Sequence, residues 1–222
     1  MDITKLKSML SQKWLLNGAE LNNKFKVLAD ILLNEVLIEK GEQKYLITDI
    51  EFYLYTSAHK DIITYPRNCK AGQWFFHSSG VDISFESNVG TEVKAKSKKR
   101  MCYLTDDSVF GGILIKAIEP AWVENSEDGA VNDFKGPQKV CYELFDMFDS
   151  FGNADNFPRL IISPHKRDIA VQPRHNLLTK DKTVEMKVDS ILANNYCGSD
   201  IKKDELIKGF NEYLEAEYRF HI

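Results

Sequence analysis

The stretch YLITDIEFYL, at residues 45–54, decides the fold expected for this chain. Apolar residues and one threonine occupy every second position, namely Leu46, Thr48, Ile50, Phe52 and Leu54. The positions between them include Asp49, Glu51 and Tyr53. Because successive side chains of a β-strand point to opposite faces, this spacing predicts a strand with one face in the core. The other face then presents two carboxylates and a phenol together.

Three further strands are predicted downstream of this stretch. Gly72 to His77 is an aromatic segment, and a serine-glycine turn separates it from Val81 to Glu86. Ile113 to Ile118 has the apolar composition of a buried strand. The strand from Val81 places three polar side chains on one face, namely Asp82, Ser84 and Glu86.

Helical patterns flank this strand-rich middle. Apolar residues recur at helical spacing before it, at Leu21, Phe25, Leu28, Leu32 and Val36. Pro137 to Phe148 is typical of a helix with proline at its first position, and Ile201 to Tyr218 of a helix opened by Ser199 or Asp200. This arrangement favours an α+β fold with a central, mostly antiparallel sheet flanked by helices.

Length and composition point to one intracellular domain. The 222 residues, 43% hydrophobic and 28% charged, lie close to the globular average, and no linker divides residues 1–222. The chain has neither a membrane-spanning run nor the apolar centre of a signal peptide near its start, so a cytoplasmic location is expected. Its four cysteines lie more than 30 residues apart, which predicts reduced thiols.

Six separated motifs, in order along residues 45–148, resemble the alkyladenine (3-methyladenine) DNA glycosylase family. They are Glu51-Phe52-Tyr53, His59, Thr64-Tyr65-Pro66-Arg67-Asn68, Lys70-Ala71-Gly72, Lys116-Ala117-Ile118-Glu119-Pro120 and Gly136-Pro137-Gln138-Lys139-Val140. The resemblance implies a diverged member of that family with its formyltransferase C-terminal-like fold. It implies an enzyme that acts on damaged DNA.

The resemblance also assigns roles to individual residues. Glu51 would activate water for hydrolysis of the N-glycosidic bond of an alkylated purine, without a cofactor. Other residues would bind the base in a pocket, and of these Glu86 stands where the family has asparagine and Lys116 where it has arginine. The predicted substrate-binding residues are Tyr53, His59, His77, Glu86 and Lys116. We expect Glu51, Tyr53, His59 and His77 to converge on one pocket.

Departures from the family pattern keep two other functions open. His77 stands near a position where the family stacks an aromatic residue on the base, and Ser79 replaces the tyrosine that wedges into the duplex. Because serine cannot fill the gap left by an extruded nucleotide, unstacking would go uncompensated. The chain could therefore be a non-catalytic protein that binds a nucleobase, a nucleotide or another small ligand. It could also be an N-glycosidase of nucleosides or single strands.

Cationic residues supply possible contacts to DNA phosphates. The net charge of −4 gives no global attraction to DNA, so such contacts must be local. Candidates are Arg67 and the run that includes Lys98, Lys99 and Arg100, which would otherwise be the solvated tip of a hairpin. No metal is expected, because the histidines and carboxylates match no local metal-binding spacing. The sequence predicts no structure for residues 153–183.

Overall fold

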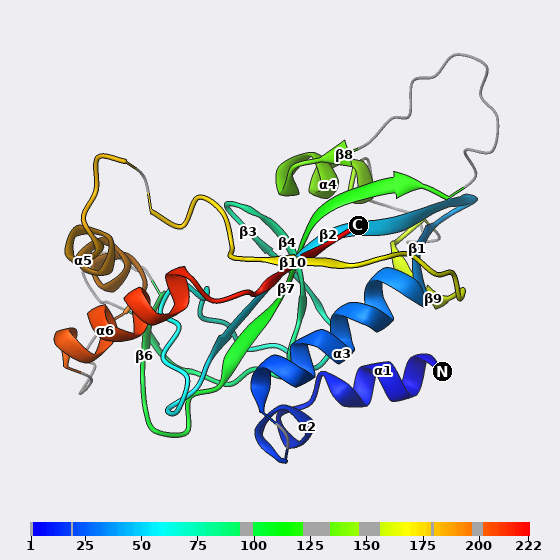
Figure 1. The fold of residues 1–222 in the computed structure, drawn as a ribbon. Helices are drawn as coiled ribbons and strands as arrows, with labels where there is room; N and C mark the ends of the chain where they lie inside the picture. The colour runs from blue at the N-terminus through cyan, green and yellow to red at the C-terminus, as the bar shows by residue number, and fades with distance from the viewer. Residues whose placement is uncertain are drawn as a thin grey trace.

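The computed structural model describes residues 2–18, 20–93, 100–121, 134–146, 156–178, 180–196 and 202–222, and it is an α+β fold with a mostly antiparallel sheet flanked by helices (Figure 1). The helices are α1 (Ile3–Met9), α2 (Gln12–Leu16), α3 (Leu21–Asn34), α4 (Pro137–Leu144), α5 (Val184–Asn195) and α6 (Lys203–Leu214). The strands are β1 (Val36–Lys40), β2 (Gln43–Tyr55), β3 (Trp74–His77), β4 (Gly80–Ser84), β5 (Gly90–Val93), β6 (Arg100–Tyr103), β7 (Phe110–Pro120), β8 (Phe134–Lys135), β9 (Arg159–Ile162), β10 (Ala170–Gln172) and β11 (Arg219–His221).

The main sheet is built around the long pair β2 and β7. Its strand order is β10-β11-β2-β7-β4-β3, with β1 pairing both β2 and β9. The β2–β7 ladder runs antiparallel from Tyr45 opposite Pro120 to Tyr55 opposite Phe110. The expected strand at residues 45–54 is therefore confirmed as the middle of the sheet, and a separate pair, β5 and β6, stands apart from it.

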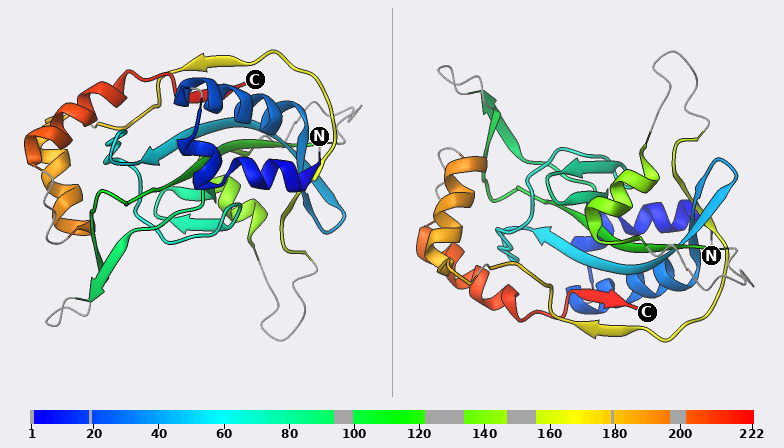
Figure 2. Two further views of the ribbon diagram at one scale, coloured as in Figure 1. Left: turned by 90° about the horizontal axis from the view of Figure 1, so that it is seen from below. Right: turned by 90° about the horizontal axis from the view of Figure 1, so that it is seen from above.

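The alternating pattern of β2 buries one face of the strand. There Phe52 stacks on Phe25 of α3, with ring centroids 4.4 Å apart. Nearer the start of β2, beyond the register shifts that follow Ile47, the hydroxyl of Tyr45 donates a hydrogen bond to Glu143 of α4. Figures 1 and 2 show α1, α2 and α3 gathered on one side of the sheet and α4 on the other. Glu51 and Tyr53 thus lie on the α4 side, away from the main layer of helices.

The helix ends differ from the sequence-based expectations. The helix expected over residues 21–36 ends at Asn34, because Val36 already pairs with Ile162 as the first residue of β1. The expected Pro137–Phe148 helix has proline at its first turn but ends at Leu144, and Phe148 lies outside the described residues. Val140 and Leu144 are buried in the core.

The last helix is shorter than the range predicted from the sequence, Ile201 to Tyr218. It spans Lys203–Leu214 with Lys202 as its N-cap, and Ser199 and Asp200 lie outside the described residues. Beyond it the chain forms β11, which pairs with β2 and buries Phe220 against Phe52. The end of the chain extends because pairing with β2 satisfies its backbone groups and its apolar side chain at once.

A second hydrophobic cluster lies beyond one end of β2 and β7. Tyr55 and Phe110 stack there, and Val188 of α5 and Phe210 of α6 pack against the same cluster. This end of the sheet therefore carries α5 and α6, which lie together in Figure 1. No helix among the described residues is long and apolar enough to cross a membrane.

Candidate active site

A cavity of about 580 Å³, here called the Glu51 pocket, opens on the face of the sheet opposite α3. Strands β2 and β7 supply Glu51, Tyr53 and Lys116, and the hairpin β3–β4 supplies His77 and Asp82. The segment after β10 and the helix α5 complete its walls. The structure therefore brings together five of the predicted site residues, namely Glu51, Tyr53, Arg67, His77 and Lys116.

Glu51 is a buried carboxylate held by three donors. Its side chain is 2% exposed. Oε1 accepts hydrogen bonds from Lys116 Nζ at 2.6 Å and from the backbone N–H of His175 at 3.2 Å, and Oε2 accepts one from the Tyr53 hydroxyl at 2.7 Å. Because a carboxylate offers about four acceptor positions, one position on Oε2 has no donor among the residues that the structure describes. The three hydrogen bonds thus fix the orientation of the Glu51 side chain, and its carboxylate can accept a further hydrogen bond.

The position of Lys116 depends on an irregularity in the β2–β7 ladder. The successive partners of Asp49 and Ile50 are Ala117 and Ile115, so Lys116 is passed over. Such irregularities locally re-aim side chains and are frequent beside active sites. Here the ammonium group reaches Glu51 across the strand pair, and its side chain is only 15% exposed.

The Tyr53 hydroxyl keeps its proton and acts as a hydrogen-bond donor. Burial, followed by the neighbouring charge of Glu51, raises the pKa of Tyr53 well above its ordinary value. The hydroxyl therefore stays protonated near neutral pH and donates to Glu51. The guanidinium of Arg174 lies over the ring, 4.5 Å from its centroid, which holds the ring in place.

A second buried carboxylate, Asp82, forms a triad with Arg67 and His77. The Arg67 Nη1 lies 2.6 Å from Asp82 Oδ2, and His77 Nε2 lies 2.9 Å from Oδ1. Arg67 is only 4% exposed and also lies 3.8 Å above the Phe75 ring. Arg67 therefore lines the Glu51 pocket with its charge paired to Asp82, and its contact with DNA phosphate stays a prediction.

Both ring nitrogens of His77 take part in hydrogen bonds. Its Nδ1 accepts a hydrogen bond from the backbone N–H of Ser79 at 3.2 Å, so the ring proton is on Nε2 and is donated to Asp82. The ring stacks on Tyr65 with centroids 4.6 Å apart. These contacts make His77 part of a rigid aromatic wall in the Glu51 pocket.

The Asp82 triad predicts a measurable acid response. Burial alone would raise the pKa of Asp82, but the charge of Arg67 and the hydrogen bond from His77 outweigh it and hold the pKa below its ordinary value. Since the unfolded-state pKa is about 3.9, Asp82 stabilises the fold fully above that pH, and the contribution is lost as the pH falls through the folded-state pKa. We expect Asp82→Asn to lose less unfolding free energy than the parent between about pH 5 and pH 2. Urea titrations at both pH values measure this, and equal losses in parent and variant would contradict it.

Two predicted site residues lie elsewhere. His59 does not line the Glu51 pocket, because its ring lies between Leu54 O, 2.6 Å from Nδ1, and the Tyr218 hydroxyl, 2.9 Å from Nε2. Burial lowers the pKa of His59, which keeps it neutral. Glu86 is exposed beyond the end of β4, and its Oε2 accepts from the backbone N–H of Gln12. Neither residue is placed to touch a ligand in the pocket.

The predicted basic run cannot be placed in this site. Lys98 and Lys99 lie outside the described residues, and Arg100 begins β6, of which only the backbone is described at that position. Two cations that were not predicted also line the pocket. Lys182 and Lys187, before and within α5, line it and form no ion pair with any carboxylate that the structure describes.

Sequence reasoning missed the segment that closes the pocket. His175 supplies its backbone N–H to Glu51, and Asn176 follows with φ of 59°, a left-handed conformation that asparagine tolerates. A helix signal for α5 was present in the sequence, because Thr183 precedes apolar residues at helical spacing, at Val184, Val188, Ile191 and Leu192. No local pattern marks His175, since its contact uses only the backbone.

The described residues contain no group of three histidine, cysteine, aspartate or glutamate side chains able to hold a metal ion. Comparison with protein-family models, with curated proteins and with solved structures found no match for this chain. The chemistry of the Glu51 pocket therefore has to be argued from its own residues.

Proposed function

We propose that this protein is an N-glycosidase that releases a damaged, alkylated purine from DNA, with Glu51 activating the attacking water. The water oxygen bonds to the sugar carbon as the bond from that carbon to the base nitrogen breaks. Glu51 takes the proton of the water, and the electron pair of the broken bond leaves with the base. The negative carboxylate also stabilises the positive charge that builds on the sugar.

The observation that carries this proposal is the held but unsaturated carboxylate of Glu51. Lys116, Tyr53 and the His175 N–H occupy three acceptor positions, the fourth has no donor among the described residues, and Glu51 lines the cavity. A general base has to be oriented, and it needs an acceptor position within reach of water. A carboxylate with a purely structural role would have that position filled by a protein donor.

The rest of the Glu51 pocket suits a flipped or free base. The stacked rings of His77 and Tyr65 form a flat wall, and aromatic stacking is a common way to hold a nucleobase. The volume of about 580 Å³ lies within the range of small-molecule sites. Lys182 and Lys187 add positive charge at the wall formed by α5, which favours a substrate that carries phosphate.

A second candidate function is binding of a nucleobase or nucleotide without cleavage. Ser79 favours it, because this residue lines the pocket and is too small to replace an extruded nucleotide in a duplex. The same feature favours hydrolysis of single strands or nucleosides. These functions share the pocket and differ in whether a base is released and from which substrate.

A base-release assay on matched substrates tests the proposal. Duplex and single-stranded oligonucleotides carrying hypoxanthine, ethenoadenine or alkylated adenine, and the corresponding nucleosides, are incubated with the protein. Release of free base from DNA supports the proposal. Release from single strands or nucleosides alone restricts it to substrates whose bases are reached without a side chain that wedges into a duplex. Saturable binding without release from any of them would replace it with the second candidate.

A further inference from the structure

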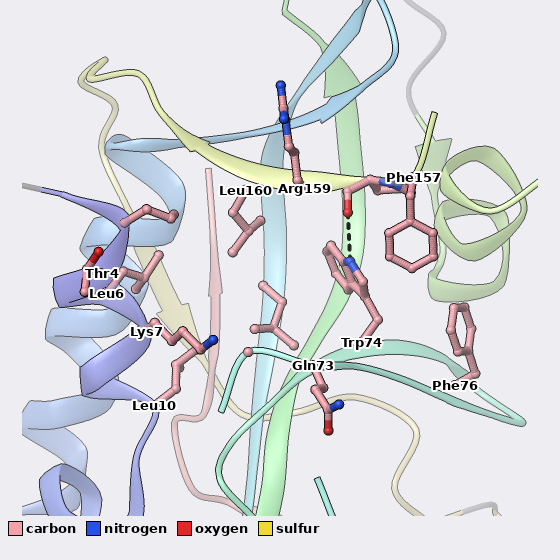
Figure 3. A pocket seen from close by; sticks show the side chains of 14 residues that line it. Thr4, Leu6, Lys7, Leu10, Gln73, Trp74, Phe76, Phe157, Arg159 and Leu160 are labelled. Atoms are coloured by element: carbon pink, nitrogen blue, oxygen red, sulfur yellow. Dashed lines mark hydrogen bonds between the residues drawn. The ribbon is translucent and has the colours of Figure 1, made fainter. Parts of the chain in front are cut away.

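A second cavity, of about 740 Å³, lies on the opposite side of the β3–β4 hairpin from the Glu51 pocket (Figure 3). It is walled by α1, by β3 and by the start of β9, and we call it the α1 groove. Alternation along the hairpin separates the two sites. His77 and Asp82 face the Glu51 pocket, whereas Trp74, Phe76 and Ile83 line the α1 groove.

The walls of the α1 groove are apolar and partly uncovered. Phe76 is 50% exposed and Phe157 is 43% exposed, although large aromatic side chains are usually buried. The indole N–H of Trp74 donates to the carbonyl of Pro158 at 2.9 Å, so the one polar atom of that ring is already satisfied. Leu6 and Leu10 of α1 form the facing wall. A concave, largely apolar cavity of this volume is typical of a small-molecule site.

The charges around the α1 groove are of one sign. Lys7 and Arg159 line it, and no aspartate or glutamate does. Arg159 is already neutralised by Glu39, with Nη2 and Oε2 2.5 Å apart. Lys7 forms no ion pair with any residue that the structure describes, and its side chain extends from α1 into the groove, toward Gln73 (Figure 3). One uncompensated cation therefore stands in an otherwise apolar cavity.

We propose that the α1 groove binds a small amphiphilic carboxylate, with the carboxylate paired to Lys7 and the hydrocarbon packed on Trp74, Phe157 and Leu160. Burial of the hydrocarbon supplies most of the affinity, because apolar area removed from water dominates such binding. Lys7 selects the anion over neutral or cationic amphiphiles of the same length. The two cavities share no residue, so this site is independent of base release in the Glu51 pocket.

Calorimetric titration of the full chain with dodecanoate, below its aggregation concentration, tests the proposal. We expect saturable binding with one site per chain, and weaker binding of dodecanol and dodecylamine. Lys7→Met keeps the length of the side chain and removes its charge, so it should weaken dodecanoate binding about two- to fivefold, the range of an exposed ion pair. Thr4→Phe places a ring at the groove from an exposed position of α1 and should weaken binding at least about tenfold by occupying the cavity.

Lys5→Met is the matched control for Lys7→Met. Lys5 lies on the same helix and is exposed, but it does not line the α1 groove, so its replacement should leave affinity unchanged. Equal affinity of the parent and Lys7→Met, or equal binding of dodecanol and dodecanoate, would overturn selection of the anion. Full affinity in Thr4→Phe would place the ligand outside the groove, and absence of dodecanoate binding by the parent would overturn the site.

Discussion

Glu51→Gln should lower the rate of base release at least about 100-fold, the effect typical of losing a general base. The amide keeps the size of the side chain but lacks the basic oxygen that accepts a proton from water. Folding should survive, because glutamine can still accept from Lys116 or Tyr53 through its carbonyl oxygen. Single-turnover base release measures the chemical step, and circular dichroism with thermal unfolding checks the fold.

Glu86→Gln is the matched control for this substitution. Glu86 is exposed, lies outside the Glu51 pocket and, among the residues that the structure describes, accepts only from the backbone N–H of Gln12 at 3.0 Å. The same chemical change there should leave base release within about twofold of the parent. If the parent releases a base and Glu51→Gln releases it equally fast, Glu51 is not the base, and Asp82 becomes the carboxylate to test next.

The sequence predicts those residues of the site whose positions follow from alternation along a strand. Glu51 and Tyr53 share a strand face because they are two residues apart, and Leu114 and Lys116 share one for the same reason. Antiparallel pairing then sets Glu51 opposite Leu114 and brings Lys116 within reach. Alternation along β2 therefore suffices to predict the carboxylate and the phenol of the pocket, whereas the position of Lys116 also depends on the register shift beside it.

The residues that were misplaced depend on contacts between distant segments. His59 follows β2 closely in sequence, but its ring is held by Tyr218, 159 residues further along the chain. Arg67 was predicted only as a phosphate contact, and its pairing with Asp82 against the Phe75 ring was not foreseen. No local pattern encodes such a partner, so burial of a charge becomes visible only once the strands are paired.

Arg174 is the clearest case of a long-range contact that the sequence does not mark. Its Nη1 lies 2.6 Å from Asp61 Oδ2, and both side chains are 0% exposed. The guanidinium also donates to the backbone carbonyls of Phe52 at 3.2 Å and Tyr213 at 3.1 Å. It thereby ties the segment after β10 to β2 and α6. Because His175 is the next residue, this ion pair also sets the N–H that orients Glu51.

Arg174→Met should lower the free energy of unfolding by about 3–5 kcal/mol, because it leaves the Asp61 carboxylate buried without its partner. Urea unfolding at neutral pH measures the loss. The surface pair of Lys60 and Glu205, with side chains 30% and 49% exposed, is the control, and Lys60→Met should cost no more than about 1 kcal/mol. Combining Asp61→Leu with Arg174→Met removes both charges, so the double variant should lose less than the sum of the two single losses. Additive losses, or a loss in Arg174→Met as small as in Lys60→Met, would contradict a buried ion pair between Arg174 and Asp61.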